Sequence, residues 1–273
     1  MPTFSFKGRE VFYLAEGQGE PIMLLNGIMM SIKSWDPFKH ALTSSNTLIR
    51  LDFLDQGQSD ALVNSVYDID LQAELVDHLL THLKIKKINI VGISYGGEVA
   101  LSFACKYPHR LRRLVLFNTT PYTSPWLAEI GHKWNAIGRQ RDGKTYYQAT
   151  IPIIYSPSYY ETHLDWMKKR EEILIPVFSN PEFLDKIERL TNSAEHFDMR
   201  EHLHKIQVPT LIVAADEDYL TPIQNQKALH DALSHSELVI LPGVGHASMY
   251  ERPLLFTSLV LGFINTVDET YNI

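Results

Sequence analysis

The sequence has very little cysteine. Cys105 is the only one among 273 residues, so an intramolecular disulfide is impossible. A small secreted scaffold held by disulfides is therefore excluded, and a reducing cytoplasm is the expected location. A chain of this length buries a large apolar core without cross-links, so stability makes no demand on disulfides or on a structural metal.

The sequence also lacks an excess of positive charge and a long apolar segment. Lys and Arg total 25 against 32 Asp and Glu, a formal net charge of −7. Nucleic-acid binding needs a basic patch that releases counterions, so we expect no nucleic-acid partner. The longest apolar stretch, residues 254–264, is well short of the roughly 20 residues of a membrane span. We expect no membrane partner, and the N-terminal residues lack the apolar region of a signal peptide.

Short apolar runs alternate with helical patterns along the chain. Continuous apolar runs are typical of strands buried on both faces, and such strands form a mainly parallel sheet covered by helices. Between residues 71 and 83, leucine recurs every four residues, which gives a helix one apolar face. Helices are also predicted over residues 95–107 and 254–267. The predicted strands cover residues 23–25, 47–51, 88–91, 114–117, 211–215 and 238–241.

The alternation of strands and helices is interrupted once, between about residues 121 and 207. This stretch is helix-like and holds three of the four tryptophans. We predict a helical cap over residues 121–205, inserted into a core formed by residues 1–120 and 206–273. The aromatic rings of this insertion either line a substrate pocket or form the cap's own small core.

A serine stands in a favourable place for chemistry. The segment Gly92-Ile-Ser94-Tyr-Gly96 is a G-x-S-x-G motif that directly follows an apolar strand and directly precedes a helix. A tight strand-to-helix turn strains its central residue and leaves no room for side chains at the flanking glycines. Ser94 is therefore a candidate nucleophile. The amide of Tyr95, at a helix N-terminus, is a candidate donor to an oxyanion.

A serine nucleophile needs a histidine base and a carboxylate that orients it. The strand at 211–215 leads into Asp216, Glu217 and Asp218, and the strand at 238–241 is followed by a loop that ends at His246. Carboxyl ends of parallel strands meet at the same edge of a sheet, so these side chains are expected near Ser94. Spacing alone leaves the choice among the three carboxylates open.

On these motifs the chain, from about residue 21 to 266, resembles the serine-nucleophile branch of the α/β-hydrolase superfamily. The resemblance implies an α/β-hydrolase fold, with a mainly parallel sheet flanked by helices and an inserted helical cap. It implies that Asp218, in the segment Asp218-Tyr-Leu-Thr-Pro222, is the acid partner of His246. It also implies that the backbone amide of Ile28 is a second oxyanion donor, and it implies no cofactor.

Two segments depart from the family pattern. In Leu25-Asn26-Gly27-Ile28-Met29, Asn26 stands where most members have His, a loop similar to that of 3-oxoadipate enol-lactonases. In the segment from Asp52 to Asp60, Asp55 stands where the family has Gly. Asn26, Met29 and Trp126 are the residues that we expect to line the substrate pocket.

The predicted function is hydrolysis of a small carboxylic ester or lactone through an acyl enzyme on Ser94. Thioester cleavage, carbon–carbon bond hydrolysis and acyl transfer use the same three residues, and a ligand sensor without turnover also remains open. His202 and His204 could suggest a metal site, but we expect solvated surface side chains and no metal. The oligomeric state is left open.

Overall fold

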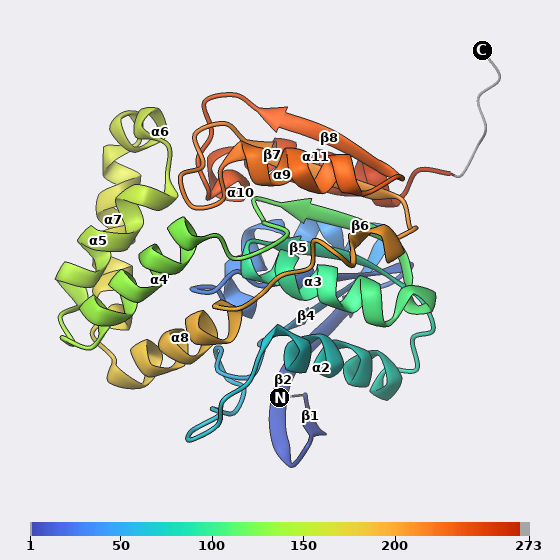
Figure 1. Cartoon of the computed structure of the whole chain (residues 1–273), viewed down its shortest axis with the longest axis horizontal. Helices are drawn as coiled ribbons and strands as arrows, with labels where there is room; N and C mark the ends of the chain where they lie inside the picture. Colours follow the sequence, from blue (N-terminus) through green and yellow to red (C-terminus); the bar gives the residue numbers. More distant parts are fainter. Residues whose placement is uncertain (1, 268–273) are drawn as a thin grey trace.

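The computed structural model describes residues 2–267 and has a sheet of eight strands at its centre (Figure 1). The order across the sheet is β1-β2-β4-β3-β5-β6-β7-β8. β2 pairs antiparallel with both β1 and β4, and all other pairs are parallel, so the predicted mainly parallel sheet is confirmed. The strands are β1 (Thr3–Phe6), β2 (Arg9–Gly17), β3 (Glu20–Leu25), β4 (Asn46–Leu51), β5 (Ile88–Ile93), β6 (Leu111–Phe117), β7 (Thr210–Ala215) and β8 (Ser236–Leu241).

Each of the six apolar runs predicted as strands falls within one of the strands β3 to β8. β5 and β7 are buried at every position, as expected where helices cover both faces. β8 differs from the expected buried strand, because it is an edge strand and Leu241 is its one buried residue. β1 and β2 are missing from the sequence-based prediction, because many of their residues are exposed and β2 carries charged side chains.

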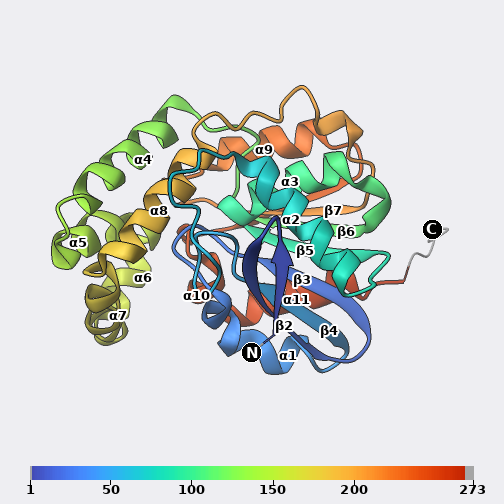
Figure 2. The same cartoon turned by 90° about the horizontal axis from the view of Figure 1, so that it is seen from below.

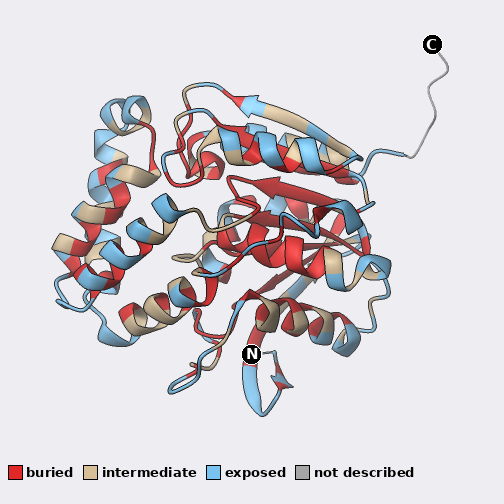
Figure 3. Ribbon diagram, in the orientation of Figure 1, coloured by how far each residue is buried: buried red, intermediate tan, exposed pale blue. Residues whose placement is uncertain are grey.

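The helices cover the two faces of the sheet, and alternate residues of the strands supply the two cores. Met23 and Leu25 of β3 pack on the face of α2, α3 and α9, whereas Ile22 and Leu24 pack on the face of α1 and α11. Figure 3 shows the buried strands between helices whose outer faces are exposed. Within residues 2–267, no helix is long and apolar enough to cross a membrane. The helices outside the insertion between β6 and β7 are α1 (Lys39–Leu42), α2 (Ile69–His82), α3 (Tyr95–Lys106), α9 (Ile223–Ala232), α10 (Ser248–Glu251) and α11 (Pro253–Ile264). Short 3-10 turns lie at Ile32–Phe38, Pro108–Arg110 and Leu203–Lys205.

Five further helices lie between β6 and β7 in the chain and form the cap: α4 (Pro125–Gly138), α5 (Gly143–Ile154), α6 (Pro157–Thr162), α7 (Leu164–Phe178) and α8 (Pro181–Ala194). Figures 1 and 2 show them at one end of the sheet, beyond the arrowheads of the parallel strands. The helix-like character of the insertion thus agrees with the structure, while the division at residues 121 and 205 stays a prediction. Trp134, Tyr146, Tyr147, Tyr155 and Phe178 are buried together inside the cap and form its own core, and Trp134, Tyr155 and Phe178 also line the cavity between cap and sheet, so the rings do both.

Three prolines of this stretch mark the starts of helices, whereas Pro152 and Pro176 lie inside α5 and α7. α4, α6 and α8 each begin with proline, which lacks the amide hydrogen that a first helical residue would leave unbonded. The preceding residues Ser124, Ser156 and Asn180 each accept a hydrogen bond from a backbone amide in the first turn. Local sequence therefore sets where these cap helices begin.

Two buried carboxylates attach the cap to the core. Asp55 accepts hydrogen bonds from Nε and Nη2 of Arg189 on α8, at 2.9 and 2.7 Å. Glu251 on α10 accepts the backbone amide and the hydroxyl of Ser156, both at 2.7 Å, and also the amide of Gly245 in the loop before His246. The second contact links the start of α6 to the segment that carries the histidine.

Candidate functional site

Ser94 lies at a strained turn between β5 and α3. Its φ is 53° and its ψ is −122°, a conformation that residues other than glycine rarely adopt. A Cβ on Gly92 would lie 2.5 Å from the carbonyl oxygen of Gly96, and a Cβ on Gly96 would collide with the carbonyl oxygen of Leu25. The two glycines of the motif are therefore required by close backbone approach.

Neighbouring groups hold Ser94 in this conformation. Its amide donates to the carbonyl oxygen of Phe117 at 3.0 Å. Its carbonyl oxygen accepts the Thr119 hydroxyl at 2.8 Å and the Gly97 amide at 2.8 Å. Strain of this kind persists only when the surrounding structure over-determines it, and it is common at functional sites. The side chain of Ser94 is left half-buried, and its Oγ has no hydrogen-bond partner within residues 2–267.

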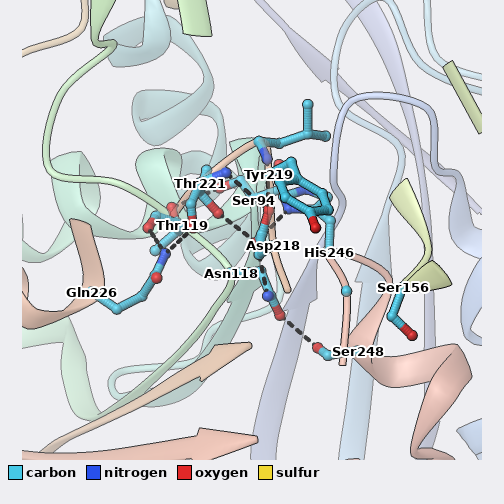
Figure 4. A network of polar contacts seen from close by, with 12 residues as sticks. Ser94, Asn118, Thr119, Ser156, Asp218, Tyr219, Thr221, Gln226, His246 and Ser248 are labelled. Atoms are coloured by element: carbon cyan, nitrogen blue, oxygen red, sulfur yellow. Dashed lines mark hydrogen bonds and ion pairs between the residues drawn. The ribbon is translucent and has the colours of Figure 1, made fainter. Parts of the chain in front are cut away.

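Asp218 and His246 form a buried pair beyond the ends of β7 and β8 (Figure 4). Nδ1 of His246 donates to Oδ2 of Asp218 at 2.8 Å. Because a carboxylate only accepts, this contact places the ring proton on Nδ1 and leaves Nε2 free to act as a base. Oδ1 of Asp218 accepts the amides of Leu220 and Thr221, both at 2.9 Å, and Oδ2 also accepts the Thr221 hydroxyl at 2.8 Å.

The hydrogen bonds keep Asp218 ionised despite its burial. Burial alone would raise the pKa of this carboxyl, but its interaction with His246 and the hydrogen bonds from His246, Thr221 and Asn118 outweigh it and lower the pKa below the ordinary value. The neighbouring carboxylates lie elsewhere. Asp216 is exposed and accepts the amide of Gly243, and Glu217 makes no contact with the histidine. Asp218 is thus the one carboxylate of the three that contacts His246.

Asn118 is a site residue that the sequence analysis missed. Its Nδ2 donates to Oδ2 of Asp218 at 2.9 Å, and its Oδ1 accepts the hydroxyl of Ser248 at 2.5 Å (Figure 4). Asn118 directly follows β6, at the same edge of the sheet as Ser94. A polar residue at the carboxyl end of a central parallel strand is the signal that could have identified it.

A cavity of about 180 Å³ lies between the core and the cap, and both Ser94 and His246 line it. Its walls are mostly apolar, as is usual for small-molecule sites. Ile28 and Tyr95, the expected oxyanion donors, also line it beside Ser94. Neither amide has a hydrogen-bond acceptor within residues 2–267, and the Tyr95 amide is at the positive N-terminal end of α3.

The three expected pocket residues lie in three different environments. Met29 lines the cavity. Asn26 does not, because its fully buried side chain donates to the Leu51 carbonyl and accepts the indole hydrogen of Trp35 at 2.6 Å. Trp126 lies outside the cavity with 60% of its surface exposed, because its indole nitrogen donates to the carbonyl of Tyr219. Asn26 therefore supports the loop that carries Ile28 and does not itself face the cavity.

The departure at Asp55 has a structural explanation. The backbone of Asp55 has a φ of 66°, a conformation in which glycine is the usual residue and Asp is among the few tolerated side chains. Its carboxylate accepts the Leu62 amide at 3.0 Å and the Tyr67 hydroxyl at 2.9 Å, in addition to Arg189. The aspartate thus keeps the turn of the family glycine and adds an attachment for the cap.

His202 and His204 form no metal site in the described structure. Within residues 2–267, no three histidine, cysteine, aspartate or glutamate side chains are grouped so that they could hold a metal ion.

Comparisons with known proteins agree with this fold. Residues 20–150 match the family model described as alpha/beta hydrolase fold, and residues 190–255 match a model described as TAP-like protein. The crystal structure of MGS-M2, described as an alpha/beta hydrolase enzyme from a Medee basin deep-sea metagenome library, is 47% identical with a TM-score of 0.97 and full coverage of both chains. The chain belongs to the α/β-hydrolase superfamily.

More distant relatives carry different functional names. The 2-hydroxy-6-oxononadienedioate/2-hydroxy-6-oxononatrienedioate hydrolase of Escherichia coli (strain K12) is 28% identical over 262 residues, with 91% of this chain and 88% of that protein covered. The enol-lactonase of Burkholderia xenovorans LB400 is 22% identical with a TM-score of 0.84, covering 97% of this chain and all of that one, and it shows the fold alone. The enzyme is therefore a hydrolase of this superfamily, and the bond that it cleaves is not fixed by these relatives.

Proposed function

We propose that the protein hydrolyses a small carboxylic ester, with lactones as a subclass, through an acyl enzyme formed on Ser94. The observation that carries the proposal is that the strained Ser94 and His246, whose ring is bonded to Asp218, line one apolar cavity under the cap. The same cavity thus holds a serine at φ 53° and a histidine whose Nε2 has no hydrogen-bond partner within residues 2–267, which suits a nucleophile and its base. We place the reaction in the cytoplasm because of the single cysteine.

In the acylation step, Oγ of Ser94 attacks the ester carbonyl carbon and its proton passes to Nε2 of His246. The negative charge that develops on the carbonyl oxygen is stabilised by the amides of Ile28 and Tyr95. The bond to the alcohol oxygen then breaks, and His246 donates its proton to the leaving group. Asp218 holds the imidazole in the required tautomer and stabilises its charged form.

In the deacylation step, water attacks the acyl carbonyl carbon while His246 accepts one of its protons. The bond between the acyl carbon and Oγ breaks, and the proton returns from His246 to Ser94. A carboxylic acid is released, and the protein is restored. With a lactone, the alcohol and the acid remain in one molecule.

The test is the release of p-nitrophenol from p-nitrophenyl esters of increasing acyl length, for the intact protein and for Ser94→Ala. We expect a burst or steady turnover that falls at least about a thousandfold in the variant, because the nucleophile is lost while the rest of the site remains. Equal urea midpoints for the two proteins would show that the variant folds. Retention of more than a few per cent of the turnover would contradict the role of Ser94.

An independent test uses a fluorophosphonate, which reacts with activated serines. Incubation should add one phosphonyl group to the protein, and peptide mass spectrometry should place it on Ser94. His246→Ala serves as the matched variant, since Oγ keeps its position but loses its base, and labelling should slow by orders of magnitude. Equal labelling in the two proteins would exclude His246 as the base.

A second candidate is hydrolysis of a carbon–carbon bond in a dienedioate-type substrate, favoured by the name of the Escherichia coli relative. Arg170 of α7 lines the cavity and would suit an anionic substrate. Turnover of a dienedioate with no turnover of any ester or lactone would replace the ester proposal. Binding of ligands without turnover of any of these classes would indicate a sensor.

A further inference from the structure

A buried carboxyl group that the proposed mechanism does not use also lines the cavity. Glu98 lies on α3, four residues after Ser94, and only 4% of its surface is exposed. Its Oε2 is fully buried and has no hydrogen-bond partner within residues 2–267. Buried polar atoms in native proteins are nearly always hydrogen-bonded, so an unpartnered one at a ligand cavity indicates a partner supplied by the ligand.

Glu98 lies near the candidate nucleophile Ser94 in the chain and in the cavity. α3 begins directly after Ser94, and Glu98 lies in its first turn. Ser94 and Glu98 line the same cavity, so a substrate with its acyl carbon at Ser94 can place a later part of the acyl chain beside Glu98. The cap lies opposite, where α8 contributes Thr191 and Asn192 to the cavity lining. None of the ion pairs within residues 2–267 involves Glu98.

The surroundings keep Glu98 neutral at physiological pH. Burial raises its pKa to about 8, and no neighbouring positive charge opposes this. The titratable group beside it on the core side is the Tyr95 phenol, which bonds to Ser193. The other titratable side chains that line the cavity are His132, Tyr155, Arg170, Glu195, His246 and Tyr250.

We propose that Glu98, as a carboxylic acid, donates a hydrogen bond to a second carbonyl oxygen on the acyl chain of the substrate. The inference rests on the ester hydrolysis proposed above and adds a substrate class, the esters of oxo acids. A hydroxyl group could bond to either form of the carboxyl, whereas a carbonyl oxygen only accepts and requires the protonated form. An alkyl chain would leave the donor unpaired, and an ammonium group would require the ionised form.

The experiment compares two nearly isosteric esters, p-nitrophenyl 5-oxohexanoate and p-nitrophenyl 5-methylhexanoate. The measured quantity is the ratio of their kcat/KM values, in which pH effects common to the two esters cancel. At pH 6.5 we expect the intact protein to prefer the oxo ester about tenfold, the size of one hydrogen bond to an otherwise unpaired buried donor. Above pH 8 the ratio should fall toward one, because the carboxylate cannot donate.

Three variants test whether the Glu98 side chain recognises the oxo group of the substrate or only supports the structure. Glu98→Leu should bring the ratio to one or below, because the donor is gone. Glu98→Gln should keep a preference for the oxo ester at every pH, because an amide donates without ionising. Glu195→Gln is the matched control, since that carboxylate also lines the cavity but already accepts from Nε2 of His132 at 3.1 Å. The control should leave the ratio unchanged.

The outcomes distinguish failure of this inference from failure of the proposed function. If the protein hydrolyses the esters but Glu98→Leu leaves the ratio unchanged, the proposed recognition of the oxo group by Glu98 is wrong, and the proposed ester hydrolysis is unaffected. If p-nitrophenyl 6-aminohexanoate is the best substrate and Glu98→Gln loses it, Glu98 acts as a carboxylate and the proposal is overturned. If no ester is turned over, calorimetry with 5-oxohexanamide and 5-methylhexanamide still tests recognition, and equal binding by the intact protein would refute it.

Discussion

Replacing Glu98 by glutamine should stabilise the protein, and more so as the pH rises. The perturbation is nearly isosteric and removes one titrating group from the buried end of the cavity. In the folded protein, burial raises the pKa of Glu98 from its ordinary 4.5 to about 8. In the unfolded chain this carboxyl has a pKa near the ordinary 4.5. Between pH 4.5 and about pH 8 the folded protein therefore keeps a proton that the unfolded chain has released.

The sign and size of the effect follow from this linkage. Because the folded pKa is raised, the contribution of Glu98 to stability is fully present below pH 4.5 and is lost as the pH rises to about 8. One pKa unit corresponds to 1.36 kcal/mol, so the loss is about 3 kcal/mol at pH 7 and approaches about 5 kcal/mol above pH 8. Glutamine does not titrate and avoids the loss. Against a typical total stability of about 5–15 kcal/mol, the effect is readily measured.

The assay is urea unfolding of the intact protein and of Glu98→Gln at pH 5, 6, 7, 8 and 9. Titrations of all other groups cancel in the difference between the two free energies of unfolding. This difference should rise by about 1.4 kcal/mol per pH unit up to about pH 8 and then level off, with equal m-values for the two proteins. A difference that does not change with pH would show that Glu98 is ionised in the folded state, which would refute the reasoning.

Three further predictions concern the supports of the site. Asn118→Ala should lower kcat about tenfold with little change in KM in an ester assay, because it removes a hydrogen bond that orients the acid; an unchanged kcat would make Asn118 purely structural. Glu251→Gln should lower the free energy of unfolding by about 2 kcal/mol in urea titration, because a neutral amide cannot accept all the donors that join the cap to the histidine loop. Arg189→Leu should cost about 3–5 kcal/mol by leaving Asp55 buried and unpaired, and adding Asp55→Gly should recover part of this loss. A double variant less stable than the single one would mean that the other contacts of Asp55 matter more than its charge.

Local sequence was sufficient for the parts of the fold that depend on neighbours in the chain. The apolar runs of β3 to β7 predict buried strands because helices cover both faces, and the Gly92 to Gly96 motif predicts the turn because only glycine fits there. β8 was located but was expected to be buried, since apolar composition does not reveal that a strand lies at an edge. β1 and β2 were not found, because antiparallel strands at a solvated edge lack a continuous apolar run.

The residues of the candidate site also fall into those that the sequence could identify and those that it could not. Ser94, the acid segment and His246 could be found because each follows a strand, and the carboxyl ends of parallel strands meet at one edge. Of the three expected pocket residues only Met29 lines the cavity, because the lining depends on side-chain direction and on packing of the cap. Asn26 turns inward to bond with Trp35, and Trp126 lies outside against Tyr219.

By itself, the sequence determined the class of fold, the chain order of serine, acid and histidine, and the places where the cap helices begin. These depend on spacing, on glycine and proline, and on residues a few positions apart. The spacing left three carboxylates open, the family resemblance pointed to Asp218, and the structure shows its contact with His246. Only the tertiary structure shows that Asn118 joins them and that Oε2 of Glu98 has no hydrogen-bond partner within residues 2–267. Such contacts join residues that are far apart in the chain, as Asp218 and Asn118 are, and their burial depends on the packing of several elements at once.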